Sequence, residues 1–254
     1  MLKFLYQTKK RFTMIIIPAR IGSTRFPNKV LIDIAGVPMV IRTAQAVESI
    51  DRVVIATDSQ KVMNVASKYG IKAVMTSSQH HSGTDRIFEA SQKLNLADDE
   101  IIVNVQGDEP FIETEVVQAV FDLTKRQRSD KEIIMSSCYK NIDSQEADDP
   151  NIVKVVTTKE DLALYFSRSK IPYSRDLDFH EYKGHIGIYG FTKKSLATFC
   201  QLSSAPIEDI EKLEQLRALH HGFKISMTQV QTQSFGIDTP NDLEKALKVF
   251  NNQY

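Results

Sequence analysis

The stretch "IIIPARIGSTRFPNKVL", from Ile15 to Leu31, indicates the fold class of this chain. It begins as an apolar, strand-like run and then breaks into a loop that holds Arg20, Arg25 and Lys29. Open α/β sheets bind ligands beyond the carboxyl ends of their strands, and cationic side chains there are suited to phosphate. The loop therefore predicts a phosphate site, although a basic loop can also be merely solvated.

This loop matches neither of the two common phosphate-binding motifs. A Walker loop would need a second glycine five residues after Gly22, where the chain has Pro27. The dinucleotide-binding fingerprint fails as well, because no second glycine occurs before Gly36. The loop is therefore neither a P-loop nor a dinucleotide-binding turn.

Composition and charge narrow the class of protein. With 254 residues, 42% of them apolar, the chain can bury one sizeable core. Its 32 basic residues balance 32 acidic ones, so its net charge does not favour nucleic acid or an anionic membrane. Cys138 and Cys200 are too few for a disulfide framework and lack metal-ligand spacing, which favours a reducing cytoplasm. No apolar run approaches the ~20 residues of a membrane helix.

The first half of the chain alternates strand-like and helix-like segments. Strand candidates occur at 14–19, 53–57, 71–76 and 101–105, and helix candidates at 38–48, 59–69, 84–94 and 113–126. This rhythm is typical of βαβ units and predicts an α/β fold with a mostly parallel sheet.

The second half has a different pattern. Closely spaced strand candidates at 133–139, 152–158, 163–168 and 185–190 indicate an antiparallel extension, at about 133–190. A helix near 207–219, a strand at 224–230 and a closing helix from about 241 follow. We interpret residues 1–13 as an N-terminal tail and 14–254 as a single domain.

A second polar cluster, "QGDEP" at 106–110, follows the strand candidate at 101–105. An aspartate at that edge of the sheet is well placed to hold Mg²⁺ beside a triphosphate, because this ion takes one or two carboxylates and completes its shell with phosphate oxygens and waters. The alternative is that these acids cap the helix that begins near Glu113. Capping is the favoured interpretation for Glu109, and metal binding for Asp108.

Other motifs are individually weak. Asp238 before Thr239 and Pro240 is an ordinary turn or cap residue, but with Asp108 it could complete a site for two metal ions. Each remaining stretch has a structural interpretation as well. Ser82–Thr84 could cap a helix, Tyr189 could be a strand aromatic, His185 could be structural, and Glu208, Glu211 and Glu214 could line a solvated helical face.

Together these motifs resemble the family of 3-deoxy-manno-octulosonate cytidylyltransferases, from about Met14 to the last helix. The matching motifs are PARxxSTRxPxK at 18–29, SGTxR at 82–86, VNVQGDEP at 103–110, YFSRxxIP at 165–172, HxGIYG at 185–190, LEQLR at 213–217 and GxDTP at 236–240. The first motif alone would indicate only a sugar nucleotidyltransferase. The 165, 185 and 213 motifs in that order are more specific.

The resemblance implies a Rossmann-like nucleotidyltransferase fold with an antiparallel dimerisation extension, and hence a homodimer. It implies transfer of CMP from CTP to the anomeric hydroxyl of the acidic sugar 3-deoxy-D-manno-octulosonate (KDO), for lipopolysaccharide synthesis, with Mg²⁺ as cofactor. The implied site residues are Ala19, Arg20, Lys29, Gly83 and Gln106 for the nucleotide; Asp108 and Asp238 for magnesium; and Gln106, Arg168, His185, Tyr189, Glu214 and Gln215 for the sugar. Arg20, Lys29, Asp108 and Asp238 are the implied catalytic residues.

Two features depart from the family pattern. Asn28 precedes Lys29 where glycine is common, and Ile21 with Gly22 replaces an aromatic and a small residue. Asparagine tolerates a positive φ better than most residues, so the turn is expected to survive. Two rival functions stay open: a cytidylyltransferase for another acidic sugar, such as sialic acid or an amino-substituted KDO, and a nucleotide-binding regulator without catalysis.

Overall fold

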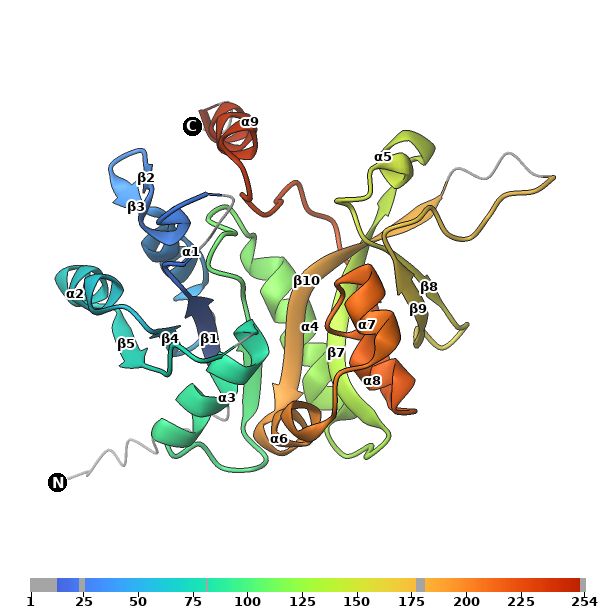
Figure 1. The fold of residues 1–254 in the computed structure, drawn as a ribbon, viewed down its shortest axis with the longest axis horizontal. Helices are drawn as coiled ribbons and strands as arrows, with labels where there is room; N and C mark the ends of the chain where they lie inside the picture. Colours follow the sequence, from blue (N-terminus) through green and yellow to red (C-terminus); the bar gives the residue numbers. More distant parts are fainter. Residues whose placement is uncertain (1–12, 23–25, 81, 177–180, 252–254) are drawn as a thin grey trace, which may run out of the picture.

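A computed structural model describes residues 13–22, 26–80, 82–176 and 181–251. Within these residues the strands form a nine-stranded sheet whose main path runs β11-β7-β10-β6-β1-β4-β5, with β8 paired to β10 and β9 to β8 (Figure 1). The strands are β1 (Thr13–Ala19), β4 (Val53–Thr57), β5 (Lys72–Met75), β6 (Ile101–Asn104), β7 (Ile133–Ile142), β8 (Lys154–Thr157), β9 (Ala163–Ser167), β10 (Tyr182–Thr192) and β11 (Lys224–Gln229). The predicted tail falls on residues outside this description, except Thr13, which already belongs to β1.

The chain enters the sheet at an internal strand. β1 pairs in parallel with β4 on one side and with β6 on the other, so that Ile15 lies opposite both Val53 and Val103. The chain first builds outward through β4 to β5 and then returns to the other side of β1. The loops after β1 and β6 therefore leave neighbouring strands at the same edge of the sheet, which is where open α/β sheets bind their ligands.

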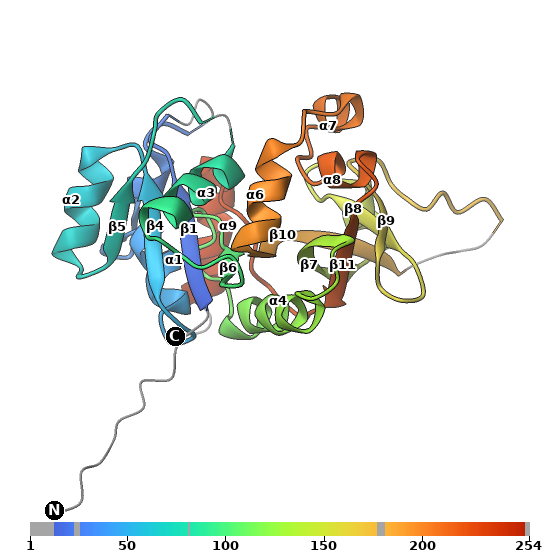
Figure 2. The ribbon, with the colours of Figure 1, turned by 90° about the horizontal axis from the view of Figure 1, so that it is seen from below.

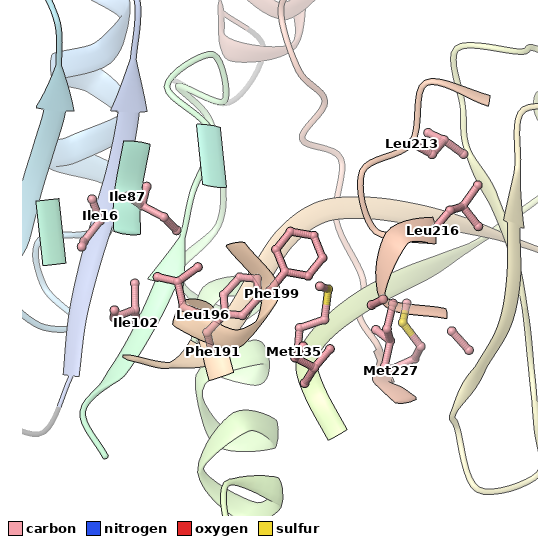
Figure 3. Close-up of a cluster of buried hydrophobic side chains, with 14 of the residues drawn as sticks. Ile16, Ile87, Ile102, Met135, Phe191, Leu196, Phe199, Leu213, Leu216 and Met227 are labelled. Carbon is pink, nitrogen blue, oxygen red and sulfur yellow. The ribbon is translucent and has the colours of Figure 1, made fainter. Parts of the chain in front are cut away.

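Strand β1 is buried on both faces, which explains its continuous apolar run. Ile15 and Ile17 pack in a core with α1 (Met39–Val47), α2 (Gln60–Lys68) and α4 (Thr114–Gln127). Ile16 packs in the other core, where it lies beside Ile87 of α3 (Gly83–Lys93); the same core includes α6 (Lys193–Gln201) (Figure 3). Figure 2 shows α6 and α4 on opposite sides of β10.

The predicted antiparallel extension is present. β10 runs antiparallel to β6, β7 and β8, and β8 runs antiparallel to β9. The last strand, β11, is parallel to β7. The remaining elements are η1 (Lys29–Leu31), β2 (Asp33–Ile34), β3 (Val37–Pro38), α5 (Ser144–Asp148), α7 (Pro206–Glu211), α8 (Leu216–His220) and α9 (Pro240–Asn251).

One predicted helix is wrong in detail. The stretch 207–219 forms two short helices, because Lys212 takes a left-handed backbone conformation with φ 54° and ends α7. A helix cannot continue through such a residue. Among the described residues, no helix is both long enough and apolar enough to cross a membrane.

Gly190 allows α4 to pack closely on β10. A Cβ atom at this position would lie 2.0 Å from Oγ1 of Thr124 and 3.2 Å from Cγ1 of Val120. We expect Gly190→Ala to push α4 outward and to lower the free energy of unfolding by about 1–3 kcal/mol, measured by urea denaturation. Gly187→Ala on the same strand is the matched control, because nothing lies within 4 Å of a Cβ atom there. Equal stability of the two variants would contradict this packing.

Candidate active site

A cleft of about 470 Å³ lies where the carboxyl end of β6, the strand β10, the α7–α8 connection and the segment before α9 meet. Seven of the predicted side chains line it: Gln106, Asp108, His185, Tyr189, Glu214, Gln215 and Asp238. A separate cavity of about 330 Å³, near the end of α4 and the start of α6, contains none of them. The cleft is therefore the candidate site.

Lys29 joins the two predicted metal-binding carboxylates. Its Nζ atom donates to Oδ2 of Asp108 at 2.6 Å and to Oδ1 of Asp238 at 2.7 Å. Lys29 follows β1, Asp108 follows β6, and Asp238 lies two residues before α9 begins at Pro240. Asn28 makes the approach possible, because it adopts a left-handed conformation with φ 56° immediately before Lys29. The expected tolerance of asparagine at this turn is confirmed.

The surroundings of Lys29 favour its charged form. Burial alone would lower the pKa of Lys29, but the attraction and hydrogen bonds of Asp108 and Asp238 outweigh it and raise that pKa. The lysine side chain is 11% exposed, against 25% for Asp108 and 44% for Asp238. The ammonium is thus charged and held between two carboxylates that remain open to a ligand.

The two carboxylates also fit a divalent cation. Both already bind one cationic atom at hydrogen-bond distance, so their oxygens converge on one position. Within the described residues, no group of three or more histidine, cysteine, aspartate or glutamate side chains could hold a metal ion. A magnesium ion here would therefore need oxygens from the substrate, as Mg²⁺ sites that use one or two carboxylates usually do.

Asp238 does not cap α9. That task belongs to Thr239, whose Oγ1 accepts from the backbone nitrogen of Asp242 at 3.2 Å. The carboxylate of Asp242 accepts in return from the backbone nitrogen of Thr239 at 2.9 Å. The capping alternative for Asp238 is therefore wrong, and its side chain accepts a hydrogen bond from Lys29.

Glu109 does not cap a helix either, contrary to the favoured expectation. Helix α4 begins after Glu113, and no side chain caps it. Glu109 is 7% exposed and faces the cleft beside Asp108. Burial, together with repulsion by Asp108 and Glu113, raises its pKa to about 8. Near neutral pH this carboxyl is therefore mostly protonated.

Three residues that line the cleft carry unpaired polar atoms. Oε1 of Glu214, Nε2 of Gln215 and Oγ of Ser234 are buried and have no hydrogen-bond partner. The other oxygen of Glu214 accepts from Oγ1 of Thr84 at 2.6 Å, which fixes the carboxylate in place. Buried polar groups are nearly always paired, so unpaired ones that line a cleft point to a bound ligand.

Gly83 and Gln106 lie together at the start of α3. A Cβ atom on Gly83 would be 3.3 Å from Cγ of Pro18 and 3.8 Å from Oε1 of Gln106. Ser82 caps α3, because its Oγ accepts from the backbone nitrogen of Asp85 at 3.0 Å. The structural interpretation of Ser82 is therefore confirmed, while the same motif places Gly83 against the loop that follows β1.

His185 is held as a neutral side chain. Its Nε2 lies 2.9 Å from Oγ of Ser137, and its ring packs edge-on against Phe166 with a centroid distance of 4.8 Å. Burial lowers the pKa of His185 to about 3 and raises that of the neighbouring Tyr189. At neutral pH both side chains offer uncharged hydrogen-bonding groups to the cleft.

The depressed pKa of His185 predicts a loss of stability in acid. A free histidine has a pKa of about 6.5, so below that pH the unfolded chain binds a proton that the folded chain excludes, down to about pH 3. Stability should therefore fall with pH in this window. Between pH 7 and pH 5 we expect wild type to lose about 1–2 kcal/mol more than His185→Gln, measured by urea denaturation at each pH. Parallel pH profiles would contradict a buried neutral His185.

The structure does not bring Arg168 to the cleft. Its guanidinium donates to the backbone oxygens of Glu211 at 2.8 Å, Pro150 at 3.0 Å and Lys212 at 3.5 Å. A direct contact with the sugar, as the resemblance implied, is therefore not supported by this placement. The sequence shows that arginine follows a strand, but not which carbonyls approach it.

Two other predicted residues lie just outside the cleft. Ala19 ends β1 and is 1% exposed, and Arg20 follows it with an exposed side chain. Both are placed at the carboxyl edge of the parallel strands. Arg25 lies outside the described residues.

Gly107 and two lysines were missed by sequence reasoning. A Cβ atom on Gly107 would be 2.9 Å from the backbone oxygen of Pro18, so only glycine lets the loops after β1 and β6 meet. Lys140 and Lys212 also line the cleft. Glycine between Gln106 and Asp108 was a usable signal, whereas nothing in the sequence marks either lysine.

Comparison with known proteins identifies relatives of this chain. A sequence profile described as Cytidylyltransferase matches residues 14–225. A 3-deoxy-manno-octulosonate cytidylyltransferase of Nitratiruptor sp. is 56% identical over 91% of this chain and 97% of its own length. One of Wolinella succinogenes is 51% identical, over 93% and 99%.

Solved structures agree with the fold. The structure of CMP:2-keto-3-deoxy-manno-octonic acid synthetase complexed with CTP has a TM-score of 0.87 at 38% identity, covering 95% of this chain and 99% of that one. A glucose-1-phosphate thymidylyltransferase from Bacillus anthracis has a TM-score of 0.64 at 15% identity, covering 93% and 94%, which supports the fold alone. The predicted nucleotidyltransferase fold is confirmed.

Proposed function

This chain belongs to the cytidylyltransferase family, and we propose that it transfers CMP from CTP to the anomeric hydroxyl of KDO and releases pyrophosphate. The observation that carries the proposal is the Lys29–Asp108–Asp238 cluster, at the edge of a cleft with unpaired buried polar atoms. The activated sugar would supply lipopolysaccharide assembly. Two free cysteines support a reducing cytoplasm as the place of reaction.

Lys29 and Arg20 supply the positive charge for the triphosphate. Lys29 is charged and set between the loops after β1 and β6, while Arg20 is exposed at the end of β1. Fixed cations at this position screen the α-phosphate from repelling the attacking oxygen. They also stabilise the negative charge that grows on the departing pyrophosphate.

Asp108 and Asp238 are the residues that would hold Mg²⁺. Their oxygens converge on one cationic position, and the ion would complete its shell with phosphate oxygens. When bound, it would polarise the α-phosphate and lower the pKa of the sugar hydroxyl. Lys29 keeps the two carboxylates from repelling each other until CTP arrives.

The β10 side of the cleft suits a polyhydroxylated sugar. Glu214 and Gln215 present a buried acceptor and a buried donor that have no partner, and His185 and Tyr189 add uncharged groups. Such side chains recognise hydroxyl groups, because each would otherwise leave a buried polar atom unsatisfied. The sugar hydroxyl can thus be held against the α-phosphorus.

The chemistry needs no covalent intermediate. Nucleotidyl transfer depends mainly on positioning and electrostatic stabilisation. Burial raises the pKa of both thiols, Cys138 and Cys200, so neither is a nucleophile at neutral pH. We assign a direct displacement in which the sugar oxygen attacks the α-phosphorus of CTP.

The antiparallel extension offers a surface for a homodimer. Two large apolar side chains in this extension are exposed, Leu164 at 59% and Tyr173 at 86%, and so is Ile210 of α7 at 81%. Large exposed apolar side chains are the groups that an association surface would cover. We expect Ile210→Glu to shift the sedimentation coefficient from dimer to monomer, whereas Tyr69→Glu, at an exposed apolar position at the end of α2, should not. A monomeric wild type would contradict the dimer.

The sugar specificity is tested by initial rates of pyrophosphate release with CTP, Mg²⁺ and a panel of acidic sugars. We expect KDO to give the highest kcat/KM, with an amino-substituted KDO and N-acetylneuraminate far below it. A higher value for either rival sugar would replace KDO as the substrate but keep the cytidylyltransferase chemistry.

A further inference from the structure

The loop at 212–215 connects α7 to α8 and forms part of the cleft wall. Its backbone begins in an energetically unfavourable conformation. Its first residue, Lys212, has φ 54°, which is unfavourable for any residue with a side chain. The same loop holds the unpaired buried atoms of Glu214 and Gln215. A strained loop with unsatisfied polar atoms needs an external restraint, or it would relax.

Glu211 and Arg168 supply such a restraint by binding each other's backbone. The carboxylate of Glu211 accepts from the backbone nitrogen of Arg168 at 2.9 Å and from Oγ of Ser167 at 2.6 Å. Nε of Arg168 donates to the backbone oxygen of Glu211 at 2.8 Å, and its second terminal nitrogen donates to that of Lys212 at 3.5 Å. These reciprocal hydrogen bonds fix Glu211, which precedes the loop, and the backbone oxygen of Lys212, the first residue of the loop.

A buried lysine anchors this pair to the sheet. Nζ of Lys154, on β8, donates to the backbone oxygen of Arg168 at 2.6 Å and to that of Asp149 at 2.9 Å. Lys154 is fully buried, and Arg168 also donates to the oxygen of Pro150. The end of α7 is therefore tied to β8, β9 and the α5–β8 connection, and cannot move independently of them.

We propose that Glu211 is a positioning residue for the acceptor sugar, acting through Arg168 to hold the 212–215 loop so that Glu214 and Gln215 face the cleft. This inference rests on the proposed function for the identity of the sugar. It assigns Glu211 no contact with substrate, and the residue does not line the cleft.

The negative charge of Glu211 allows a positioning role to be distinguished from direct binding of the sugar. KDO is an anion, so removing a nearby carboxylate should, by electrostatics alone, leave its binding unchanged or improve it. A weaker use of KDO after this change can therefore only come from lost positioning. In the proposed function CTP binds near Lys29 and Asp108 and not at the 212–215 loop, so its use should be preserved.

The test compares Glu211→Ala and Glu211→Gln with Asp209→Ala. Asp209 lies on the same helix, is exposed, and accepts from Oγ of Ser204 at 3.2 Å, so its loss removes an equal charge without touching the loop. We expect Glu211→Ala to raise the KM for KDO about tenfold and to leave the KM for CTP within about twofold. Glu211→Gln can still accept one hydrogen bond, so it should recover most of the loss.

Hydrogen exchange provides a readout that does not depend on the sugar. The backbone nitrogen of Leu213 donates to the oxygen of Glu208 at 3.2 Å, and this amide should exchange faster in Glu211→Ala but not in Asp209→Ala. Unchanged exchange, or equal increases in both KM values, would overturn the positioning role. A wild type that does not use KDO would overturn the proposed function, and the exchange result would still decide on the loop.

Discussion

Asp238→Asn is expected to slow the transfer of CMP by at least 100-fold in a single turnover, while the affinity for CTP stays within about threefold. The charge on Asp238 is half of the carboxylate pair that would hold the divalent cation, and asparagine supplies only a neutral oxygen. Losing one electrostatic group aimed at the reacting centre typically costs about 10²–10³ in rate. Arg20 and Lys29 remain to bind the triphosphate.

The matched control for this prediction is Thr239→Ala. Thr239 caps α9, so its loss should lower the free energy of unfolding by about 1 kcal/mol and leave the single-turnover rate nearly unchanged. Asp238→Asn should show the reverse: slow chemistry and a nearly normal melting temperature. Asp238→Glu should also be slow, because Mg²⁺ requires ligand distances close to ~2.1 Å. A near-wild-type rate for Asp238→Asn would remove this residue from the metal site.

Lys29→Met should affect both stability and activity. Lys29→Met removes the cation that bridges Asp108 and Asp238, so we expect the free energy of unfolding to fall by about 1–3 kcal/mol in metal-free buffer. Millimolar Mg²⁺ should restore much of it, because the ion replaces the missing charge. The kcat/KM for CTP should fall about 10³-fold, since a fixed cation has left the triphosphate.

Arg20→Met is the control for the effect on stability. Arg20 is exposed at the end of β1, and the hydrogen bonds described for the cluster come from Lys29. Its loss should impair the use of CTP without making the melting temperature depend on Mg²⁺. Differential scanning calorimetry of both variants, with and without Mg²⁺, distinguishes them. If Lys29→Met melts like wild type and ignores Mg²⁺, the two carboxylates do not form a cation site.

Local sequence patterns were enough for the parallel half of the fold. The apolar run of β1 and its regular alternation with helices specify strands buried on both faces, because each face must meet a helix. The strand spacing after residue 130 likewise specified the extension. The pattern missed the break at Lys212, since a left-handed residue other than glycine leaves no compositional trace.

The part of the candidate site that lies in the loops after β1 and β6 could be predicted from the sequence. Asp108 and Lys29 were identified from their position after strands, and Asp238 only through its supposed partner. Their direct contact was not foreseen, because it joins residues 79 and 209 positions apart. The resemblance assigned Arg168 to the sugar, whereas the structure shows its guanidinium bound to the backbone oxygens of Glu211 and Pro150, contacts that the sequence does not indicate.

The most direct measurement of the central claim is a ³¹P NMR spectrum of CTP, Mg²⁺ and equimolar KDO with the wild-type protein. The account predicts that the CTP resonances disappear and that one phosphodiester and pyrophosphate appear in equal amounts. It also predicts no change when KDO is omitted or when excess chelator is present. Unchanged CTP in the complete mixture, or release of free CMP in place of the phosphodiester, would contradict the account.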